Sequence, residues 1–382
     1  MATNPSTEGS DARARLIHRE IVQLFQLGVL AVAAFFVTRA LAASNRETTR
    51  RNGAEWYERG SHLAGVGDMD RAVQFFRRAT VTNRHEPKYV LALADALARQ
   101  HQPEPARAAL LALRESMPEH PDVNLQLARL AAARHDVAEA VSFYHNTLYA
   151  PWRATDDERR RGVRLELVDF LLAHGHADGA IPELVALATD IPDEPATHLE
   201  LGSRFASAGD WRNALAQFQS ALRQSPRHPT ALAGAGEAAF ELGDYAIARR
   251  YFRSTHGLDA SLSEKRELVE LIIAGDPLAP RIGAAERRRR LAGNIAYATG
   301  RLAGCVPAGS DAAAGDAVRV LQARAQTIDR QLQSRAGAEM DTIEDGVELV
   351  GQMEAAARRE CAAVLRDRAL LIIAQRHGAD RR

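Results

Sequence analysis

Cysteine and lysine are scarce in this sequence of 382 residues, and neither sign of charge is in excess. Cysteine occurs only at Cys305 and Cys361, a separation that fits no zinc-binding spacing such as C-x-x-C. Lysine occurs only at Lys88 and Lys265, so arginine supplies nearly all of the 49 basic residues, and 49 acidic residues balance them. A formal net charge of zero excludes an overall field that attracts nucleic acid, so we expect no nucleic-acid partner.

Motifs that carry chemistry are also missing. The sequence has no Walker phosphate loop, no G-x-S-x-G turn, no H-E-x-x-H pair and no G-x-G-x-x-G dinucleotide fingerprint. We therefore expect a protein that is not an enzyme and that holds no cofactor and no metal. Aromatic residues make up only 5%, and the apolar residues are largely alanine and leucine, which suits closely packed helices. The composition predicts an all-α protein.

One long uncharged run lies near the N-terminus. Residues 21–38 read IVQLFQLGVLAVAAFFVT, which is 18 residues without a charge. A helix of this length spans about 27 Å, close to the ~30 Å hydrocarbon core of a bilayer. We predict a transmembrane helix over residues 21–43, preceded by an N-terminal tail, residues 1–20, and followed by a linker, residues 44–52.

The same run has a second interpretation. Ala40-Leu41-Ala42 is an A-x-A pattern of the kind that ends a secretory signal peptide. The apolar run exceeds the ~7–15 residues usual in a signal peptide, so we favour a permanent anchor. Arginines lie on both sides of the segment, and the positive-inside rule therefore does not decide its orientation.

The strongest signal in the sequence is a period of 34 residues, which indicates a repeat array. A small residue recurs at this spacing, with one interruption of six residues, 155–160, that we expect to be a polar surface insertion: Ala72, Ala106, Ala140, Ala180, Ala214 and Ala248. Four residues after each alanine comes a large side chain: Phe76, Leu110, Tyr144, Leu184, Phe218 and Phe252. Small residues let two helices approach closely, and the large residue one turn later fills the space between helical hairpins.

This pattern resembles the tetratricopeptide repeat family, which has small residues at repeat positions 8 and 20, a bulky residue at position 24 and proline at position 32. The resemblance covers residues 53–262 as six units. It implies a superhelix in which each unit contains two antiparallel helices, in the windows 53–86, 87–120, 121–154, 161–194, 195–228 and 229–262. Repeats two to four depart from this pattern, because Gln102-Pro103 and His135-Asp136 replace the Gly-Asp turn of other units and Gly179 precedes Ala180.

The resemblance also implies a binding surface. In this family the first helix of each unit lines a concave groove, partly through positions 5 and 9. Position 5 corresponds here to Tyr57, Leu91, Leu125, Leu165, Leu199 and Ala233. Position 9 corresponds to Ser61, Asp95, Arg129, Asp169, Ser203 and Glu237. The implied groove is an apolar stripe beside mixed polar groups, a surface that suits an amphipathic or extended peptide from a partner protein.

The period ends near residue 263, and residues 263–382 are predicted to form a C-terminal helical region. We expect a helix at Ala284–Cys305, a loop at 306–315, a helix with a coiled-coil-like seam from Val318 to Leu332, and a final helix at about 341–376. Three such helices make a small bundle, and their seams also allow self-association. The run Arg287–Arg290 is expected to be a solvated helix face.

Cys305 and Cys361 both fall in this C-terminal region. We favour two buried free thiols, because cysteine commonly packs as a small apolar residue. A disulfide is the alternative if the two helices are neighbours in the bundle, and it would place the region in an oxidising compartment.

These observations favour a membrane-anchored scaffold that recruits proteins or peptides into its groove. Similarity to other anchored repeat proteins implies a single-pass protein of a bacterial inner membrane, with its repeats in the periplasm. One alternative is a secreted or periplasmic chaperone with a cleaved N-terminus. Another is an enzyme with a site in the C-terminal bundle, which a cluster of titratable residues there would support.

Overall fold

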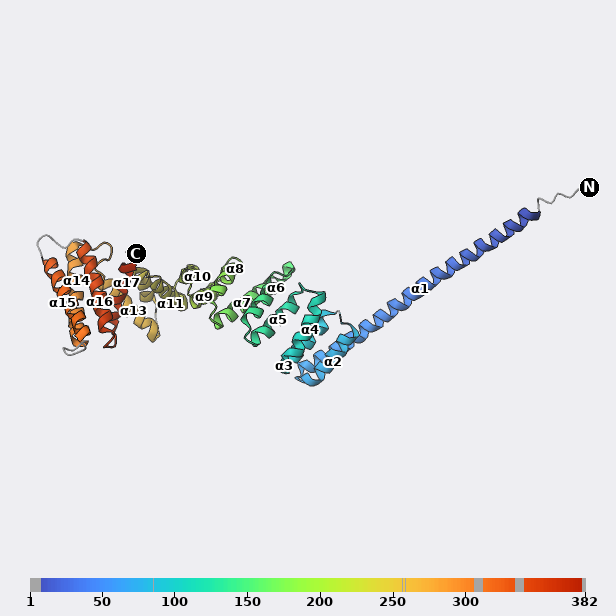
Figure 1. Cartoon of the computed structure of the whole chain (residues 1–382), viewed down its shortest axis with the longest axis horizontal. Helices are drawn as coiled ribbons and strands as arrows, with labels where there is room; N and C mark the ends of the chain where they lie inside the picture. The colour runs from blue at the N-terminus through green and yellow to red at the C-terminus, as the bar shows by residue number, and fades with distance from the viewer. Residues whose placement is uncertain are drawn as a thin grey trace, which may run out of the picture. The chain divides into compact units, whose positions relative to one another are not determined.

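The computed structural model describes residues 8–84, 86–255, 257, 259–305, 312–333 and 340–379. For residues 8–25, 42–43, 45–46, 154 and 312–315 it describes the backbone alone. Across these residues every regular element is a helix and no strand occurs, which confirms the all-α prediction. The chain divides into two compact units, Met1–Phe170 and Leu171–Arg382 (Figure 1).

The first unit begins with one long helix, α1 (Glu8–Gly65), which passes without a break through the expected linker at 44–52. It continues with α2 (Met69–Thr82), α3 (Pro87–Arg99), α4 (Pro103–Ser116), α5 (Pro121–Ala133), α6 (Val137–Leu148), the 3-10 helix η1 (Ala154–Asp156) and most of α7 (Asp157–Ala173). In the part of the chain that is described, no helix is both long and apolar enough to cross a membrane. The span expected at 21–43 lies within α1, and the side chains of residues 21–25 are outside the described set.

The second unit contains the end of α7 and all later helices. These are α8 (Ala177–Ala188), α9 (Pro195–Ser207), α10 (Trp211–Gln224), α11 (Pro229–Glu241), α12 (Tyr245–Ser254), α13 (Ala260–Gly275), α14 (Ala284–Cys305), α15 (Ala312–Gln333), α16 (Met340–Ala357) and α17 (Leu365–Ala379). The expected helix at Ala284–Cys305 is therefore confirmed at both ends.

Each of the six repeat windows contains two helices, and their packing confirms the register of the repeats. All six small residues of the 34-residue period have no exposed surface: Ala72, Ala106, Ala140, Ala180, Ala214 and Ala248. The six bulky residues that follow them are at most 3% exposed. Proline stands at the first turn of α3, α5, α9 and α11, where its missing N–H costs nothing.

The turn inside each repeat has the same geometry in all six units. After the first helix, one residue takes a left-handed conformation, and the next backbone N–H donates to the carbonyl oxygen five residues earlier, at 2.8–3.1 Å. Glycine takes the left-handed position four times, as at Gly209 with φ of 77°. His101 and His135 take it in the second and third repeats, with φ of 59° and 57°. The turns of repeats two to four, which lack the Gly-Asp pair, are therefore of the same kind as the others.

The six-residue insertion is not a loop between repeats. It forms most of η1 and the first turn of α7, which makes α7 longer than α3, α5, α9 and α11. Arg159 within it forms an ion pair with Asp122 of α5 and lies 5.6 Å from the ring centroid of Trp152. The acidic and basic residues of the insertion thus extend a helix and contact the preceding repeat.

The C-terminal helices α13 to α17 lie together (Figure 1) and share one apolar core. The predicted seam of α15 contributes Ala325, Ile328 and Leu332, which are 4–7% exposed. The expected final helix at 341–376 is wrong, because α16 ends at Ala357 and α17 begins at Leu365, and the two pack together. The expected loop at 306–315 is also too long, since α15 begins at Ala312; residues 306–311 lie outside the described residues.

Candidate functional site: the first-helix face of the repeats

In the first unit, the predicted groove positions differ in how much apolar surface they expose. Leu125 is only 4% exposed and belongs to the core, so the expectation that it lines an open groove is wrong. Leu91 and Leu165 are half-buried and retain exposed apolar surface. The Tyr57 ring lies 5.5 Å from that of Tyr89 and 5.9 Å from that of Phe76, which fixes it at the edge of an aromatic cluster.

The polar groove positions of this unit are partly committed to partners in the chain. Asp95 and Asp169 are exposed, and Asp95 pairs with Arg99 one turn later at 2.9 Å. Arg129 makes a two-point contact with Glu166 of α7, at 2.8 Å from Nε and 2.7 Å from Nη2. Arg129 therefore links two neighbouring first helices and keeps its charge compensated.

Tyr144 completes this link from α6, because its hydroxyl donates to Glu166 at 2.8 Å. Burial raises the pKa of Glu166, but the hydrogen bonds from Arg129 and Tyr144 outweigh burial and leave that pKa below its ordinary value. Burial, and then the bond to Glu166, raise the pKa of the Tyr144 phenol. Arg129, Glu166 and Tyr144 consequently keep their ordinary charge states near neutral pH, and they are suited to recognition rather than to proton transfer.

The second unit places three predicted groove residues on α9 and α11. Leu199 is half-buried, and Ser203 is exposed with its hydroxyl donating to the Leu199 carbonyl at 2.9 Å. Glu237 accepts from Lys265 of α13 at 2.6 Å, and Lys265 also donates to Glu241 at 3.0 Å. Lys265 of the C-terminal region is thus an ion-pair partner of Glu237. The repeat pattern alone does not predict this ion pair.

Sequence reasoning missed both Glu166 and Lys265 as partners of groove residues. Glu166 follows the predicted Leu165 and occupies repeat position 6, which is not among the groove positions that the resemblance implied. Lys265 lies past the end of the period. Whether the twelve predicted groove positions contact a partner stays a prediction. Of these positions Leu125 is buried, the others keep exposed surface on the first helices, and four are exposed rather than half-buried: Asp95, Arg129, Asp169 and Ser203.

A hollow of about 630 Å³ opens between α2, α3 and α4, on residues that the sequence did not point to. Val90, Leu93 and Leu113 form its apolar wall. Val81 stands at its rim with 87% of its surface exposed, an apolar residue in the otherwise polar last turn of α2. Val81 was therefore the residue by which sequence analysis could have found this hollow.

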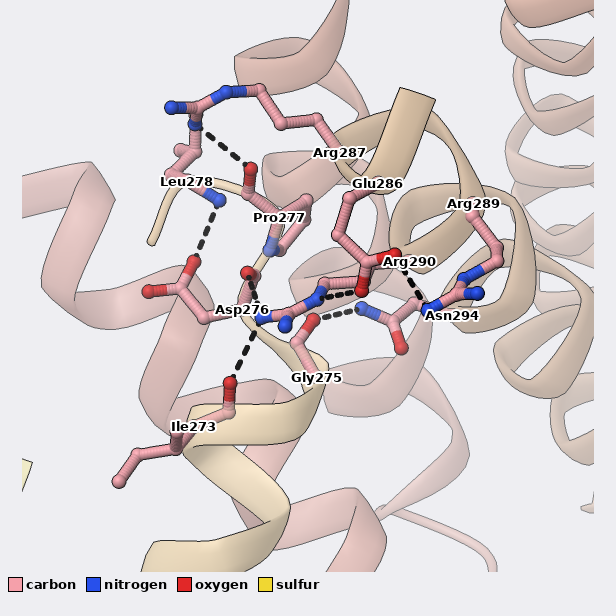
Figure 2. Close-up of polar contacts among 10 residues, drawn as sticks. All are labelled: Ile273, Gly275, Asp276, Pro277, Leu278, Glu286, Arg287, Arg289, Arg290 and Asn294. Carbon is pink, nitrogen blue, oxygen red and sulfur yellow. Dashed lines mark hydrogen bonds and ion pairs between the residues drawn. The ribbon is translucent and has the colours of Figure 1, made fainter. Parts of the chain in front are cut away.

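The arginine run of α14 is not a simple solvated face. Figure 2 shows Arg290 donating to the carbonyl oxygens of Ile273 and Asp276, at 2.9 and 3.0 Å. Arg287 donates to the Pro277 carbonyl at 3.0 Å in the same view. Two of the four arginines therefore bind carbonyl groups at and beyond the end of α13, which its last turn leaves without helical partners.

The C-terminal bundle also holds a buried cluster of titratable residues. Arg301 lies 3.2 Å from Glu354 and 2.9 Å from Asp367, and both carboxylates are 1% exposed. The Tyr297 hydroxyl donates to Asp367 at 2.7 Å. Burial, and then the charge of Asp367, raise the pKa of Glu354 to about 7, while burial and the bond to Asp367 raise the pKa of Tyr297 to about 12. Both carboxylates are thus almost fully buried inside the bundle.

Beside this cluster, Cys305 and Cys361 form a disulfide with Cα atoms 5.7 Å apart. The preference for two free thiols is therefore wrong. Cys361 lies in the connection between α16 and α17 and not within a helix as expected. Arg301 donates to the Ala362 carbonyl at 3.0 Å, so the disulfide and the buried arginine hold the same connection.

Comparison with known proteins supports the repeat assignment. A family model for the tetratricopeptide repeat matches residues 91–148 and 199–260, within both halves of the predicted array. No curated protein sequence matches the chain.

Several solved structures resemble the chain at low identity. YrrB, described as a tetratricopeptide repeat protein with an unusual peptide-binding site, shares 18% identity, with 47% of this chain and 89% of that chain covered and a TM-score of 0.37. PilW, a type IV pilus biogenesis factor, shares 16%, with 57% and 98% covered and a TM-score of 0.36. A repeat protein from Cytophaga hutchinsonii shares 11%, with 80% and 100% covered and a TM-score of 0.40. At these scores the likeness carries no information about what this chain binds.

The family assignment rests on three features of the chain itself. These are the 34-residue period, the six buried alanines that keep it, and the family model that matches two separate stretches. The chain therefore contains tetratricopeptide repeats, which the family model matches at residues 91–148 and 199–260.

Proposed function

We propose that this protein is a membrane-anchored scaffold that binds partner proteins or peptides on the first-helix face of its repeats. The observation that carries the proposal is the pairing of a half-buried leucine with an exposed acid on two first helices of the first unit, α3 and α7. Leu91 lies one turn from Asp95, and Leu165 lies one turn from Asp169. A partner helix or strand with apolar and basic side chains complements this surface.

The anchor is proposed from the sequence of residues 21–43 and from the described part of that segment. Its large apolar side chains are 53–66% exposed: Leu27, Val29, Leu30, Val32, Phe35, Phe36, Val37 and Leu41. Such a surface is costly in water at about 25 cal/mol per Å², and lipid or another apolar surface removes that cost. Membrane fractionation of the full chain and of a form lacking residues 1–43 tests this step. Sedimentation of the shortened form with membranes would exclude the segment as sole anchor.

The compartment is proposed from the disulfide. Disulfides persist in oxidising compartments and are rare in a bacterial cytosol. A bond between Cys305 and Cys361 therefore supports a single-pass inner-membrane protein whose repeats and C-terminal bundle lie in the periplasm. Thiol labelling in intact cells, before and after reduction, tests this orientation.

The groove itself is tested by charge reversal at exposed positions. We expect Asp95→Lys and Asp169→Lys together to abolish capture of a partner that the wild-type chain retains from envelope extracts. Glu119→Lys, at an exposed acid between α4 and α5, is the matched control and should retain the partner. If the control loses the same partner, or if the groove variant keeps it, binding occurs elsewhere.

A secreted or periplasmic chaperone is the second candidate. It shares the groove but predicts a cleaved N-terminus, so the intact mass of the native protein separates the two. Self-association through the C-terminal helices also stays a proposal. The α15 seam is largely buried within the chain, so an association would have to use other residues of that region.

A further inference from the structure

A pocket in the C-terminal bundle is lined by arginine side chains that keep free hydrogen-bond donors. It has a volume of about 320 Å³ and opens between α13, α14 and α17. Its apolar wall comes from Leu271, Ala369 and Leu370, and Arg289 and Arg366 lie at its charged side. Its lining shares no residue with the first-helix face of the repeats or with the disulfide.

Arg366 is the feature that points to a ligand. Its guanidinium carbon lies 4.0 Å from the ring centroid of Tyr297, so the planar group stacks on the ring. Stacking uses the face of the guanidinium and leaves its N–H donors, which lie in the plane, free for an acceptor. Arg366 forms no ion pair with any residue that the structure describes, although its side chain is exposed at the pocket.

The other charges around the pocket leave it positive. Glu286 supplies the acidic group of its described lining, and it already contacts Arg289 at 2.5 Å and Arg290 at 2.7 Å. Arg290 also donates from Nη1 to the carbonyl oxygens of Ile273 and Asp276 at the end of α13, as Figure 2 shows. Arg289 is 79% exposed and keeps donors beyond those that reach Glu286. Three arginines against a single glutamate in this lining favour an anionic ligand.

The open space in the pocket determines which groups of a ligand fit there. Gly293 lines the pocket, and a Cβ atom added there would meet no atom within 4 Å. The space beside Leu271 and Leu370 therefore accepts an aliphatic group of a ligand, next to the arginines that accept its carboxylate.

We propose that this pocket binds an acidic peptide segment in which a carboxylate side chain is adjacent to an aliphatic side chain. The proposal gives the C-terminal bundle a binding site of its own, and it does not depend on binding by the repeats. In the bound state, both oxygens of the ligand carboxylate accept hydrogen bonds from Arg366, and Arg289 lies beside them.

The test uses the full chain and a short, amidated, fluorescein-labelled peptide that alternates leucine and glutamate. We expect a saturable rise in fluorescence anisotropy that weakens as salt is raised. The same peptide with glutamine in place of glutamate should not bind. Absence of saturable binding up to about 1 mM, or equal binding of the glutamine peptide, overturns the proposal.

Variants of the pocket make the test specific. We expect Arg366→Gln and Arg289→Gln each to weaken binding by about tenfold, since each removes charge-assisted hydrogen bonds. Gly293→Leu should block the pocket while leaving the melting temperature unchanged or raised, because it improves helix propensity. Arg288→Gln is the matched control, since Arg288 belongs to the same run and does not line the pocket.

Three further outcomes count against the proposal. Unchanged affinity in Arg366→Gln and Gly293→Leu places the peptide elsewhere. An equal loss of affinity in Arg288→Gln shows only a general charge effect. Binding to vesicles of anionic lipid that depends on Arg366, without binding of the peptide, assigns the pocket to lipid headgroups instead.

Discussion

Gly202 lies directly beneath the ring of Phe218, so closely that a Cβ atom on Gly202 would come within 2.8 Å of the ring edge. The same arrangement joins Gly60 to Phe76 and Gly236 to Phe252, at 2.7 and 2.6 Å. These are repeat positions 8 and 24. The other three repeats carry Ala94 with Leu110, Ala128 with Tyr144, and Val168 with Leu184. Glycine therefore stands at position 8 where phenylalanine fills position 24.

The first prediction concerns this contact. We expect Gly202→Ala to lower the free energy of unfolding by about 1–2 kcal/mol, because overpacking outweighs the better helix propensity of alanine. Adding Phe218→Leu should recover part of the loss, since repeat two has alanine and leucine at these positions. Chemical denaturation measures both. Gly162→Ala is the control and should not destabilise, because a Cβ at Gly162 meets no atom within 4 Å.

The repeat region was predictable because its packing is local and periodic. One buried alanine per 34 residues fixes the register of each pair of helices, and the sequence displays it directly. The bounds of α14 were predictable for a similar reason, since a loop rich in glycine and proline follows Cys305. The break between α16 and α17 was not, because residues 358–364 contain neither glycine nor proline. Two tertiary contacts hold that break, namely the disulfide and the bond from Arg301 to the Ala362 carbonyl, while the Val364 N–H donates locally to Asp367 at 2.7 Å.

The candidate site was predictable only as a set of positions. The family resemblance placed Leu125 on the groove, yet it packs in the core at 4% exposure. Arg129 pairs with Glu166, 37 residues away, and Glu237 pairs with Lys265 outside the repeats. These pairings depend on how neighbouring helices lie together, which a periodic pattern does not encode. Figure 2 likewise shows an arginine run whose role as a cap for α13 comes from the fold.

The second prediction concerns the histidine turns. A left-handed conformation costs a residue with a Cβ about 1 kcal/mol more than it costs glycine. We therefore expect His135→Gly to raise the free energy of unfolding by about 0.5–1 kcal/mol. Gly209→Ala makes the converse change at the matched turn and should destabilise by a similar amount. A loss of stability in His135→Gly would show that the imidazole makes contacts worth more than the backbone cost.

The third prediction concerns pH and Glu354. Its pKa of about 7 in the folded protein lies above the ordinary value of 4.5, so the folded state holds this proton more tightly than the unfolded state. The resulting stabilisation is complete below pH 4.5, declines between pH 4.5 and 7, and is absent above pH 7. We expect the unfolding free energy of the bundle to fall by about 2 kcal/mol between pH 5 and pH 8.

The groups that face Glu354 define the control. Arg301 on α14 and Arg366 on α17 favour its ionised form, whereas burial and Asp367 oppose it. Glu354→Gln should flatten the pH dependence of chemical denaturation between pH 5 and pH 8. Glu360→Gln, at an exposed acid three residues past the end of α16, should leave it unchanged. A pH profile that is equally steep in Glu354→Gln would assign the dependence to other carboxylates.

The last prediction concerns the disulfide. Cys305 and Cys361 are separated by 56 positions, and closing a loop of this size restricts the unfolded chain by about 4 kcal/mol in the chain-entropy model. The bond joins the end of α14 to the connection between α16 and α17, where Arg301 also binds the Ala362 carbonyl. Reduction should therefore loosen the start of α17 first. We expect a reductant, or Cys305→Ser with Cys361→Ser, to destabilise the bundle by about 2–4 kcal/mol, as thermal melting would measure.

The double variant should also lose its response to reductant, which separates this bond from other effects of the reagent. Labelling of two free thiols in native protein that was unfolded without reduction would show that the bond does not form. In that case the proposed periplasmic orientation would lose its main support.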